Sequence, residues 1–381
     1  MKARDNLILI RPRYALNKEG LFVENAWFLV ENGVLINEGQ GEDNIENLTA
    51  QNFDGYLIPG LVNSHTHLEL SSSISLEYTG IHDYALRAPQ SHEKKINKSL
   101  DEIIAYAMNQ GTFFFSNISN NLSFCENLAH QKNFKGINFW EILGFSREKS
   151  KKQLENIRLH FEVCQKNQII PAPHSIYGTS PEIMKGLEMF KESWISIHLF
   201  EENEEWSLPE ERGRTFDFLN ALGQYERYNE LYNKNIIDYL FSFKMFREKF
   251  LLLVHLNFIS EENLIKIGNY NKNWAWVLCA RSNAFLKYRR NNWDLMNIFS
   301  SRVLLGSDSP EMAKDVSIFN EIRYIYSQHV LPEQLLWNAA TWNSYSFFNI
   351  KKVPCYLFKA KDKNELYTGT PEISYLFERK F

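Results

Sequence analysis

The sequence predicts an α/β protein, a (β/α)₈ TIM-type barrel that carries a small β-sandwich built from the two chain ends. Three observations lead to this fold class. The chain has 381 residues, which fit either two domains or one barrel with additions, and its 44% hydrophobic residues can fill a large core. Apolar runs alternate with amphipathic stretches from residue 58 to residue 347. Short β-rich runs and turns occupy residues 1–57 and 348–381.

The two chain ends predict short strands and turns, and the first fifty-odd residues show no helical period. Residues 7–11, 21–23, 26–30 and 33–37 are rich in β-forming side chains, and Glu31-Asn32-Gly33 supplies a hairpin turn signal. The tail has similar short runs at 356–358 and 373–377. We therefore expect the tail to pair with the N-terminal unit and to complete the β-sandwich.

The middle of the chain predicts eight strands, at 60–63, 112–116, 136–141, 169–172, 194–198, 251–255, 274–279 and 302–306. Helix candidates lie between them, for example at 99–110, 149–167, 181–191, 261–267 and 318–328. Ser180-Pro181-Glu182 has the residue order of a helix start. Continuous apolar strands separated by helices are typical of parallel strands covered on their outer side. Eight of them over this length favour a barrel.

Composition excludes several classes of function. Lys+Arg 42 against Asp+Glu 46 gives a net charge of -4, which argues against a partner that is a nucleic acid or an anionic membrane. The apolar run at 7–10 is too short for a signal peptide or a membrane span. Four widely spaced cysteines predict no disulfide framework, so we expect a cytoplasmic protein. The assembly state stays open, with a homodimer as one alternative.

Four strand ends carry metal-ligand chemistry. His65 and His67 are two residues apart and point to the same side of an extended chain. His198, His255 and Asp308 end the fifth, sixth and eighth predicted strands. The carboxyl ends of barrel strands open onto one face, so these side chains can meet. Three imidazoles and one carboxylate suit one borderline divalent ion, Zn²⁺ foremost and Fe²⁺ as the alternative. Taken singly, each histidine is more often a structural residue, and Asp308 could merely cap a helix.

The motifs together resemble the amidohydrolase superfamily. They are Pro-Gly-Leu-Val-Asn-Ser-His-Thr-His-Leu-Glu-Leu at 59–70, His-Leu-Phe-Glu at 198–201, His255, and Gly-Ser-Asp at 306–308. The resemblance covers nearly the whole chain. It implies that His65, His67, His198 and Asp308 are metal ligands and that His255 lies beside the attacking water.

Within this superfamily the sequence is similar to the purine and nucleoside deaminases. Glu201 follows His198 by three residues, Pro173-His174-Ser175 ends the fourth strand, and Cys279-Ala280-Arg281-Ser282-Asn283 ends the seventh. No lysine ends the fourth strand, which implies one metal ion per chain. The stretch 65–70 resembles the subgroup whose small-molecule substrate is 6-aminodeoxyfutalosine, in menaquinone biosynthesis.

The resemblance implies hydrolytic deamination with release of ammonia. Glu201 would protonate a ring nitrogen, and His255 and Asp308 would hold the water and accept its proton. The implied substrate contacts are His174 with the ribose or ring, Glu69 with sugar hydroxyls, Arg87 or Arg281 with an anionic side arm, and Ser282. Glu201 lies in the acidic run 201–205, and such runs are usually solvated.

Other functions stay open. The substrate could be S-adenosylhomocysteine, methylthioadenosine, adenosine or guanine. A different hydrolase of the same fold could remove a chloride or open a cyclic amide. A barrel without activity could serve as an assembly subunit, although the intact ligand set argues against it.

Overall fold

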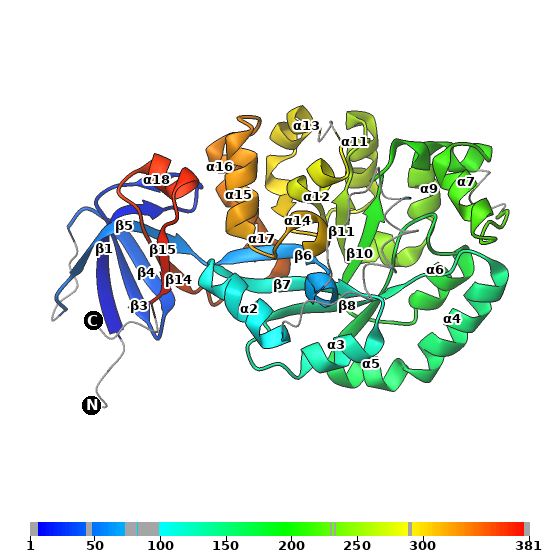
Figure 1. The fold of residues 1–381 in the computed structure, drawn as a ribbon, viewed down its shortest axis with the longest axis horizontal. Coiled ribbons are helices and arrows are strands. Elements are labelled where there is room, and N and C mark those ends of the chain that lie inside the picture. Colours follow the sequence, from blue (N-terminus) through cyan, green and yellow to red (C-terminus); the bar gives the residue numbers. More distant parts are fainter. Residues whose placement is uncertain are drawn as a thin grey trace.

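The structure is a computed structural model that describes residues 7–42, 48–72, 82, 99–228, 231, 234–288 and 292–376. Figure 1 shows two parts side by side. One part is a sheet built from both chain ends, and the other is a larger unit in which strands and helices alternate.

The larger unit contains eight parallel strands within the described residues. One four-stranded sheet has the order β6 (Leu61–Thr66), β7 (Thr112–Ser119), β8 (Gly136–Ile142) and β9 (Ile169–Pro173). The other has the order β10 (Trp194–Leu199), β11 (Phe250–His255), β12 (Trp274–Leu278) and β13 (Val303–Leu305). Every neighbouring pair in these sheets is parallel. The predicted α/β class with parallel strands is therefore confirmed, and each of the eight predicted runs contributes a strand.

The two sheets meet at both of their edges. Isolated parallel bridges join Thr66 to Asp308 and Ser175 to His198. Beside them, the Asp308 N–H donates to the His65 carbonyl at 3.0 Å. These contacts bring the carboxyl ends of β6 and β13 together, and likewise those of β9 and β10.

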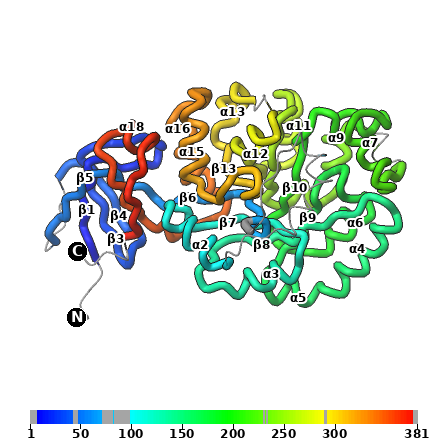
Figure 2. The backbone as a smooth tube through the Cα atoms, in the orientation of Figure 1, coloured from blue at the N-terminus to red at the C-terminus, as the bar shows by residue number. Residues whose placement is uncertain are grey.

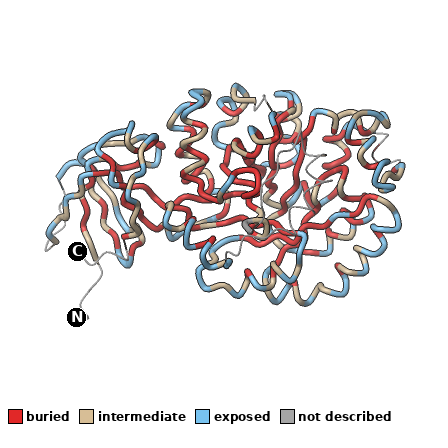
Figure 3. Tube along the Cα trace, viewed as in Figure 1, coloured by how far each residue is buried: buried red, intermediate tan, exposed pale blue. Residues whose placement is uncertain are grey.

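Burial explains the apolar runs. All residues of β9, β12 and β13 are buried, as are those of β6. Figure 3 shows the buried trace along the strands and the exposed trace along the outer helices. Strands covered on both faces need apolar side chains at successive positions, not only at alternate ones.

The helices of this unit surround the strands (Figure 2). Those that follow β6 to β9 are η1 (Leu68–Ser72), α2 (Leu100–Asn109), α3 (Leu122–Ala129), α4 (Arg147–Leu159), α5 (Phe161–Asn167) and α6 (Pro181–Leu187). Those that follow β10 and β11 are η2 (Asn203–Glu210), α7 (Arg214–Ala221), α9 (Ile236–Leu240), α10 (Lys244–Glu248) and α11 (Glu261–Tyr270). The rest are α12 (Ala280–Phe285), α13 (Trp293–Ile298), η3 (Ser300–Arg302), α14 (Pro310–Ala313), α15 (Ile318–Ser327), α16 (Glu333–Ala340) and α17 (Trp342–Phe348). Across the described ranges we find no helix with the length and apolar character needed to cross a membrane.

Helix boundaries follow local chemistry. Ser180 caps α6 by accepting from the Ile183 N–H, and Pro181 is its first residue, as predicted. The single helix expected at 149–167 is instead two helices. The break falls at His160, whose Nδ1 lies 2.9 Å from the Asn156 carbonyl and so contacts the end of α4.

The chain ends form one sheet in the described residues, with the order β15-β14-β5-β1-β3-β4 and β2 paired with β1. Its N-terminal strands are β1 (Leu7–Leu16), β2 (Phe22–Val23), β3 (Ala26–Glu31), β4 (Val34–Gln40) and β5 (Gln51–Pro59). The tail adds β14 (Cys355–Lys359) and β15 (Glu372–Tyr375), with α18 (Lys363–Thr368) between them. The expected pairing of the ends is therefore seen, because β14 runs antiparallel to β5. The description of this unit as a sandwich stays a prediction.

Candidate active site

The metal-ligand candidates lie at the carboxyl ends of the parallel strands. His65 belongs to the end of β6, and His67 follows that strand directly. His198 lies near the end of β10, and Asp308 lies three residues after β13. These side chains therefore come from the two edges at which the sheets meet.

The segment Gly306-Ser307-Asp308 fits closely against β6. The Asn63 side-chain amide donates to Ser307 Oγ at 2.8 Å, and the Ser307 N–H donates back to Asn63 Oδ1 at 3.1 Å. A Cβ at Gly306 would lie 2.9 Å from the Cβ of His65, closer than two carbons tolerate. A glycine is thus needed where β13 passes His65, and the two following residues attach Asp308 to the strand that carries the histidine pair.

The candidate ligand atoms converge on one point. Nε2 of His65 lies 3.2 Å from Nε2 of His198 and 3.6 Å from Oδ1 of Asp308. Nε2 of His67 lies 3.5 Å from the same carboxylate oxygen. Four ligands held tetrahedrally at zinc-to-nitrogen distance would stand about 3.3 Å apart. These four side chains therefore fit a single divalent cation.

The hydrogen bonds of His198 support the same conclusion. Its Nδ1 lies 3.0 Å from the carbonyl oxygen of His174, an atom that can only accept a hydrogen bond. The ring proton is therefore on Nδ1, and Nε2 presents a lone pair toward His65 and His67. Burial also lowers the pKa of His198 well below its ordinary value, so the ring stays neutral. A neutral imidazole with a free lone pair is the form that binds a metal.

Four residues at or beside these ligands have a strained backbone conformation. Phe200, His255, Leu256 and Asp308 all have φ between 51° and 75°, in the left-handed region. For residues other than glycine, such a conformation costs of the order of 1–3 kcal/mol each. The indole N–H of Trp276 donates to the His255 carbonyl at 2.7 Å and helps to hold that turn. Strained residues at three strand ends indicate that the positions of these side chains are functional.

The two acidic groups of the site have opposite protonation preferences. Burial raises the pKa of Glu201 well above its ordinary range, and the Asp308 carboxylate adds to the rise. Burial alone would also raise the pKa of Asp308, but the neighbouring imidazoles of His65, His255 and His67 hold that pKa well below its ordinary range. A carboxyl group whose protonated form is favoured therefore lies in the same cluster as one whose ionised form is favoured. Such a pair supplies an acid and a base to one reaction.

His255 contacts Glu201 and belongs to the same cluster as Asp308. Its Nε2 is 3.7 Å from Oε2 of Glu201, and His255, Glu201 and Asp308 each offer a polar atom within one 4.8 Å group. Burial lowers the pKa of His255 to about 4, so the imidazole is neutral near pH 7. A neutral imidazole at this position can hold a water molecule or accept its proton.

The acidic run 201–205 is not a solvated surface. Glu201, Glu202 and Glu205 are buried. Glu205 accepts hydrogen bonds from three successive backbone N–H groups, those of Phe200, Glu201 and Glu202, at 2.8–3.2 Å. Its carboxylate therefore fixes the turn after β10 that carries Glu201. The sequence singled out Glu201 but did not indicate this supporting role of Glu205.

Replacing Glu205 with Ala should destabilise the protein and weaken catalysis together. Three buried N–H groups would lose their acceptor, at a cost of about 3 kcal/mol or more in unfolding free energy. Displacement of Glu201 should lower kcat/KM by roughly tenfold to hundredfold. Urea unfolding and steady-state kinetics measure the two effects. Glu204→Ala is the matched control, since Glu204 has only a 3.8 Å ion pair with Arg214. Equal behaviour of the two variants would contradict this role for Glu205.

His174 and Glu69 both lie next to the cluster. Ser175 Oγ accepts from the Gly178 N–H and lies 2.8 Å from Nδ1 of His174, so it helps to orient that ring. Oε1 of Glu69 lies 3.9 Å from Nδ1 of His67, and Oε2 of Glu69 is buried with no hydrogen-bond partner in the described residues. Both residues are thus placed where a substrate bound at the cluster could meet them.

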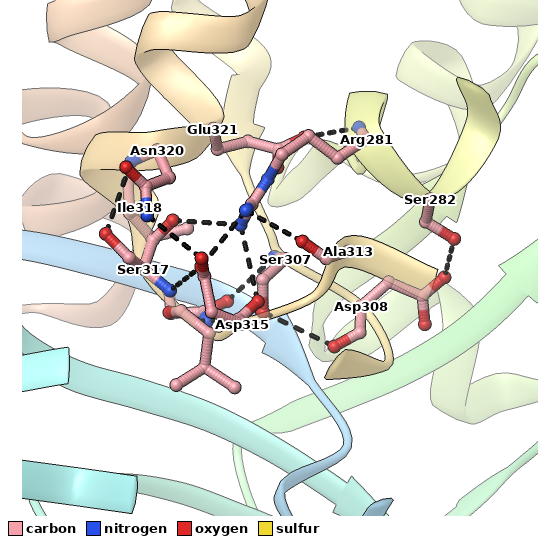
Figure 4. A network of polar contacts seen from close by, with 12 residues as sticks. Arg281, Ser282, Ser307, Asp308, Ala313, Asp315, Ser317, Ile318, Asn320 and Glu321 are labelled. Atoms are coloured by element: carbon pink, nitrogen blue, oxygen red, sulfur yellow. Dashed lines mark hydrogen bonds and ion pairs between the residues drawn. The ribbon is translucent and has the colours of Figure 1, made fainter. Parts of the chain in front are cut away.

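Ser282 has a different contact from the one expected. Figure 4 shows its hydroxyl directed at Asp308, and Ser282 Oγ donates to Oδ2 of that carboxylate. Oδ1 of Asp308 is the oxygen that faces His65 and His67. Ser282 therefore orients a metal-ligand candidate, and the geometry does not support the expected direct contact with substrate.

Arg281 is also not placed as a substrate contact. Its guanidinium points away from Asp308 (Figure 4) and binds Glu321, Asp315 and the carbonyl groups of Ala313, Asp315 and Ser317. Because its donors are committed to these partners, it ties α12 to the segment between α14 and α15. Arg87, the other cation expected to meet an anionic side arm, lies outside the described residues.

Glu141 is a residue of the site that the sequence reasoning missed. Its Oε1 is buried without a hydrogen-bond partner among the residues that the structure describes, 3.6 Å from Nδ1 of His198 and 4.0 Å from Nε2 of His174. Burial raises its pKa to about 7. The one available signal was a single glutamate in the otherwise uncharged strand β8.

Comparison with known proteins places this site in a family. A model of the amidohydrolase family matches residues 56–353, which cover the strands that carry every ligand candidate. A curated relative is an adenosine deaminase of Helicobacter pylori, 25% identical over 302 residues, with 75% of this chain and 71% of the relative covered.

Solved structures share the fold. Helicobacter pylori aminofutalosine deaminase in complex with methylthio-coformycin matches with a TM-score of 0.83 at 19% identity, over 98% of this chain and all of that one. An adenosine deaminase from Xanthomonas campestris with bound zinc matches with a TM-score of 0.67 at 15% identity, over 97% of this chain and 92% of that one.

Proposed function

The chain belongs to the amidohydrolase family and is a metal-dependent hydrolase of C–N bonds, and we propose that it deaminates an adenine-type nucleoside. The reaction replaces the 6-amino group with a 6-oxo group and releases ammonia. We further propose 6-aminodeoxyfutalosine, in menaquinone biosynthesis, as the substrate. The likeness to the aminofutalosine deaminase structure and the stretch 65–70 support this choice.

The observation that carries the proposal is the pairing of Glu201 with Asp308. Deamination of a ring amidine needs an acid to protonate the ring nitrogen and a base to take a proton from water. Glu201 and Asp308 share one cluster with His255, and the pKa of Glu201 is shifted upward while that of Asp308 is shifted downward.

The residues would act as follows. His65, His67, His198 and Asp308 hold one divalent ion, which when bound lowers the pKa of a water molecule to about 7. Glu201 donates a proton to the ring nitrogen next to C6 while the water oxygen adds to C6. His255 and Asp308 orient this water and accept its proton. Glu201 then helps to return a proton to the amino group, and the C6–N bond breaks to release ammonia.

A single metal ion per chain agrees with the hydrogen bond that His198 makes through Nδ1. The described residues contain two further groups of possible ligands, namely Glu141, His174 and His198, and Glu201, His255 and Asp308. The first would need Nδ1 of His198, which the His174 carbonyl already engages, and the second shares Asp308 with the proposed ion. We also propose that the two four-stranded sheets form one closed barrel over 58–347, because bridges join them at both edges. In that arrangement 1–57 and 348–381 form the accessory β unit.

A panel of nucleosides tests the function. Metal-loaded protein should lower the absorbance of the adenine band and release one ammonia per nucleoside from 6-aminodeoxyfutalosine, with adenosine, methylthioadenosine, S-adenosylhomocysteine and guanine as alternatives. The highest kcat/KM identifies the substrate. If no aminopurine is turned over while a chlorinated ring or a cyclic amide is, the deaminase proposal is wrong. Inactivity on all of them would favour a scaffold.

A further inference from the structure

The orientation of the Asp308 carboxylate depends on one hydroxyl group. Oδ1 of Asp308 lies 3.6 Å from Nε2 of His65 and 3.5 Å from Nε2 of His67, while Ser282 Oγ donates to Oδ2. A carboxylate turns readily about its Cβ–Cγ bond, so the partner of Oδ2 decides where Oδ1 points. Removing a hydrogen-bond partner of a metal ligand typically lowers metal affinity by about 10- to 100-fold. The position of Ser282 therefore matters to an ion bound by the four converging ligands.

Ser282 lies in the first turn of α12, a helix that is capped by a residue from another helix. Cys279, at the N-cap position, makes no side-chain capping hydrogen bond. The first backbone N–H groups of a helix therefore need an acceptor from elsewhere. Oε1 of Glu321, on α15, accepts from the Arg281 N–H at 2.9 Å, and Oε2 accepts from Arg281 Nε at 2.5 Å. One carboxylate thus holds both the backbone and the side chain of the residue next to Ser282.

Glu321 itself is held in place by the core. It is fully buried, on the face of α15 that packs inward with Ile318, Phe319, Ile322 and Ile325. The far end of the Arg281 guanidinium binds Asp315 at 3.0 Å, which keeps the Nε–H on Glu321 (Figure 4). A buried carboxylate is destabilising unless it is paired and hydrogen-bonded, so both contacts with Arg281 are needed in the folded protein.

We propose that Glu321 is a positioning residue of the metal site. It fixes the start of α12 and thereby the hydroxyl group of Ser282. Ser282 in turn selects the oxygen of Asp308 that faces the histidines. The inference rests on the proposed metal site, because Asp308 needs this orientation as a ligand. It gives Arg281 a role in the site that differs from the expected contact with substrate.

Glu321→Gln is the first test. The glutamine keeps the size of the side chain and one acceptor oxygen, but it places an amide NH₂ group against a donor of Arg281. Zinc affinity, measured by competition with a chromogenic chelator, should fall by roughly tenfold or more. The visible absorption bands of bound Co²⁺, which report the geometry of the ligands around the ion, should also change.

A control and a double variant test the route from Glu321 to the metal site. Asp315→Asn is the matched control, since Asp315 pairs with the same guanidinium but, among the described contacts, not with the backbone of α12. It should alter neither the zinc affinity nor the Co²⁺ spectrum. Ser282→Ala removes one hydroxyl group and should by itself reproduce both changes. Adding Glu321→Gln to Ser282→Ala should lower the affinity little further, because two changes along one route are not additive.

Three results would overturn the inference and leave the metal site itself intact. They are wild-type affinity and spectrum in Glu321→Gln or in Ser282→Ala, an equal loss in Asp315→Asn, and additive losses in the double variant. Glu321→Asp keeps the buried charge but shortens its reach, and it should show the same losses if Glu321→Gln does not fold. If wild type binds neither zinc nor Co²⁺, the proposed metal site fails and the inference falls with it.

Discussion

Glu201→Gln is expected to lower kcat by about 10²- to 10⁴-fold, the range over which a positioned acid or base contributes to a rate. The glutamine side chain keeps the size and much of the hydrogen bonding of the carboxyl group but cannot give up a proton. Glu201 is 3% exposed and Oε2 lies 3.7 Å from His255, so no solvent group can readily replace it. Steady-state kinetics with the preferred nucleoside measure the loss.

Two measurements separate this chemical role from a structural one. The variant should retain the wild-type metal content, because Glu201 is not among the four converging ligands. Glu204→Gln, three residues along the same acidic run, should retain nearly full activity. Undiminished turnover in Glu201→Gln, or loss of metal with loss of activity, would contradict the role of Glu201 as proton donor.

The direction of the pH dependence follows from the raised pKa of Glu201. Its acid form is the active one, so kcat should fall as pH rises through the pKa in the folded protein. The sign is opposite for Asp308, whose ionised form is active and is lost only in strong acid. Wild type should therefore show an alkaline decline that Glu201→Gln lacks.

The sequence predicted the alternating strands and helices of the larger unit, together with the candidate metal ligands at the ends of those strands. The runs at 194–198 and 251–255 became β10 and β11 because continuous apolar residues are typical of strands buried on both faces. His65, His67, His198 and Asp308 came with these strands, since carboxyl ends of parallel strands share one face. Pattern and spacing were sufficient to predict that these four side chains lie together, and their role as metal ligands stays a prediction.

The supporting residues depend on contacts that spacing does not encode. The supporting role of Glu205 depends on its three hydrogen bonds to the turn after β10. The supporting role of Ser282 depends on its hydroxyl group pointing at Asp308. Arg281 was misplaced because its partner Glu321 is 40 residues away and only packing brings the two together. Glu141 was missed because nothing near it in the sequence marks a glutamate inside an apolar strand as functional.

Removal of the metal is expected to abolish activity and to lower stability. Chelation should reduce kcat by at least about 10³-fold, since lowering the pKa of water to near 7 is the step that no side chain of the site can supply. Zn²⁺ or Fe²⁺ should restore the rate. At a free metal concentration of 100 times Kd, the bound ion adds about 2.7 kcal/mol to the unfolding free energy. Elemental analysis should find one ion per chain, and a value near two would contradict the single-ion proposal.

Proton release provides a second check on the same ligand set. Burial alone would lower the pKa of His67, but the Glu69 carboxylate raises it to about 9. The metal-free protein therefore carries a proton on His67 at pH 7, and a binding cation must displace it. Zinc binding at pH 7 should release about one proton per chain, and the affinity for zinc should increase with pH until about 9.

In Glu69→Gln the pKa of His67 should drop and the proton release at pH 7 should shrink. Calorimetry in buffers of different ionisation enthalpy measures both, and identical release by wild type and Glu69→Gln would show that His67 is not a ligand held in this way.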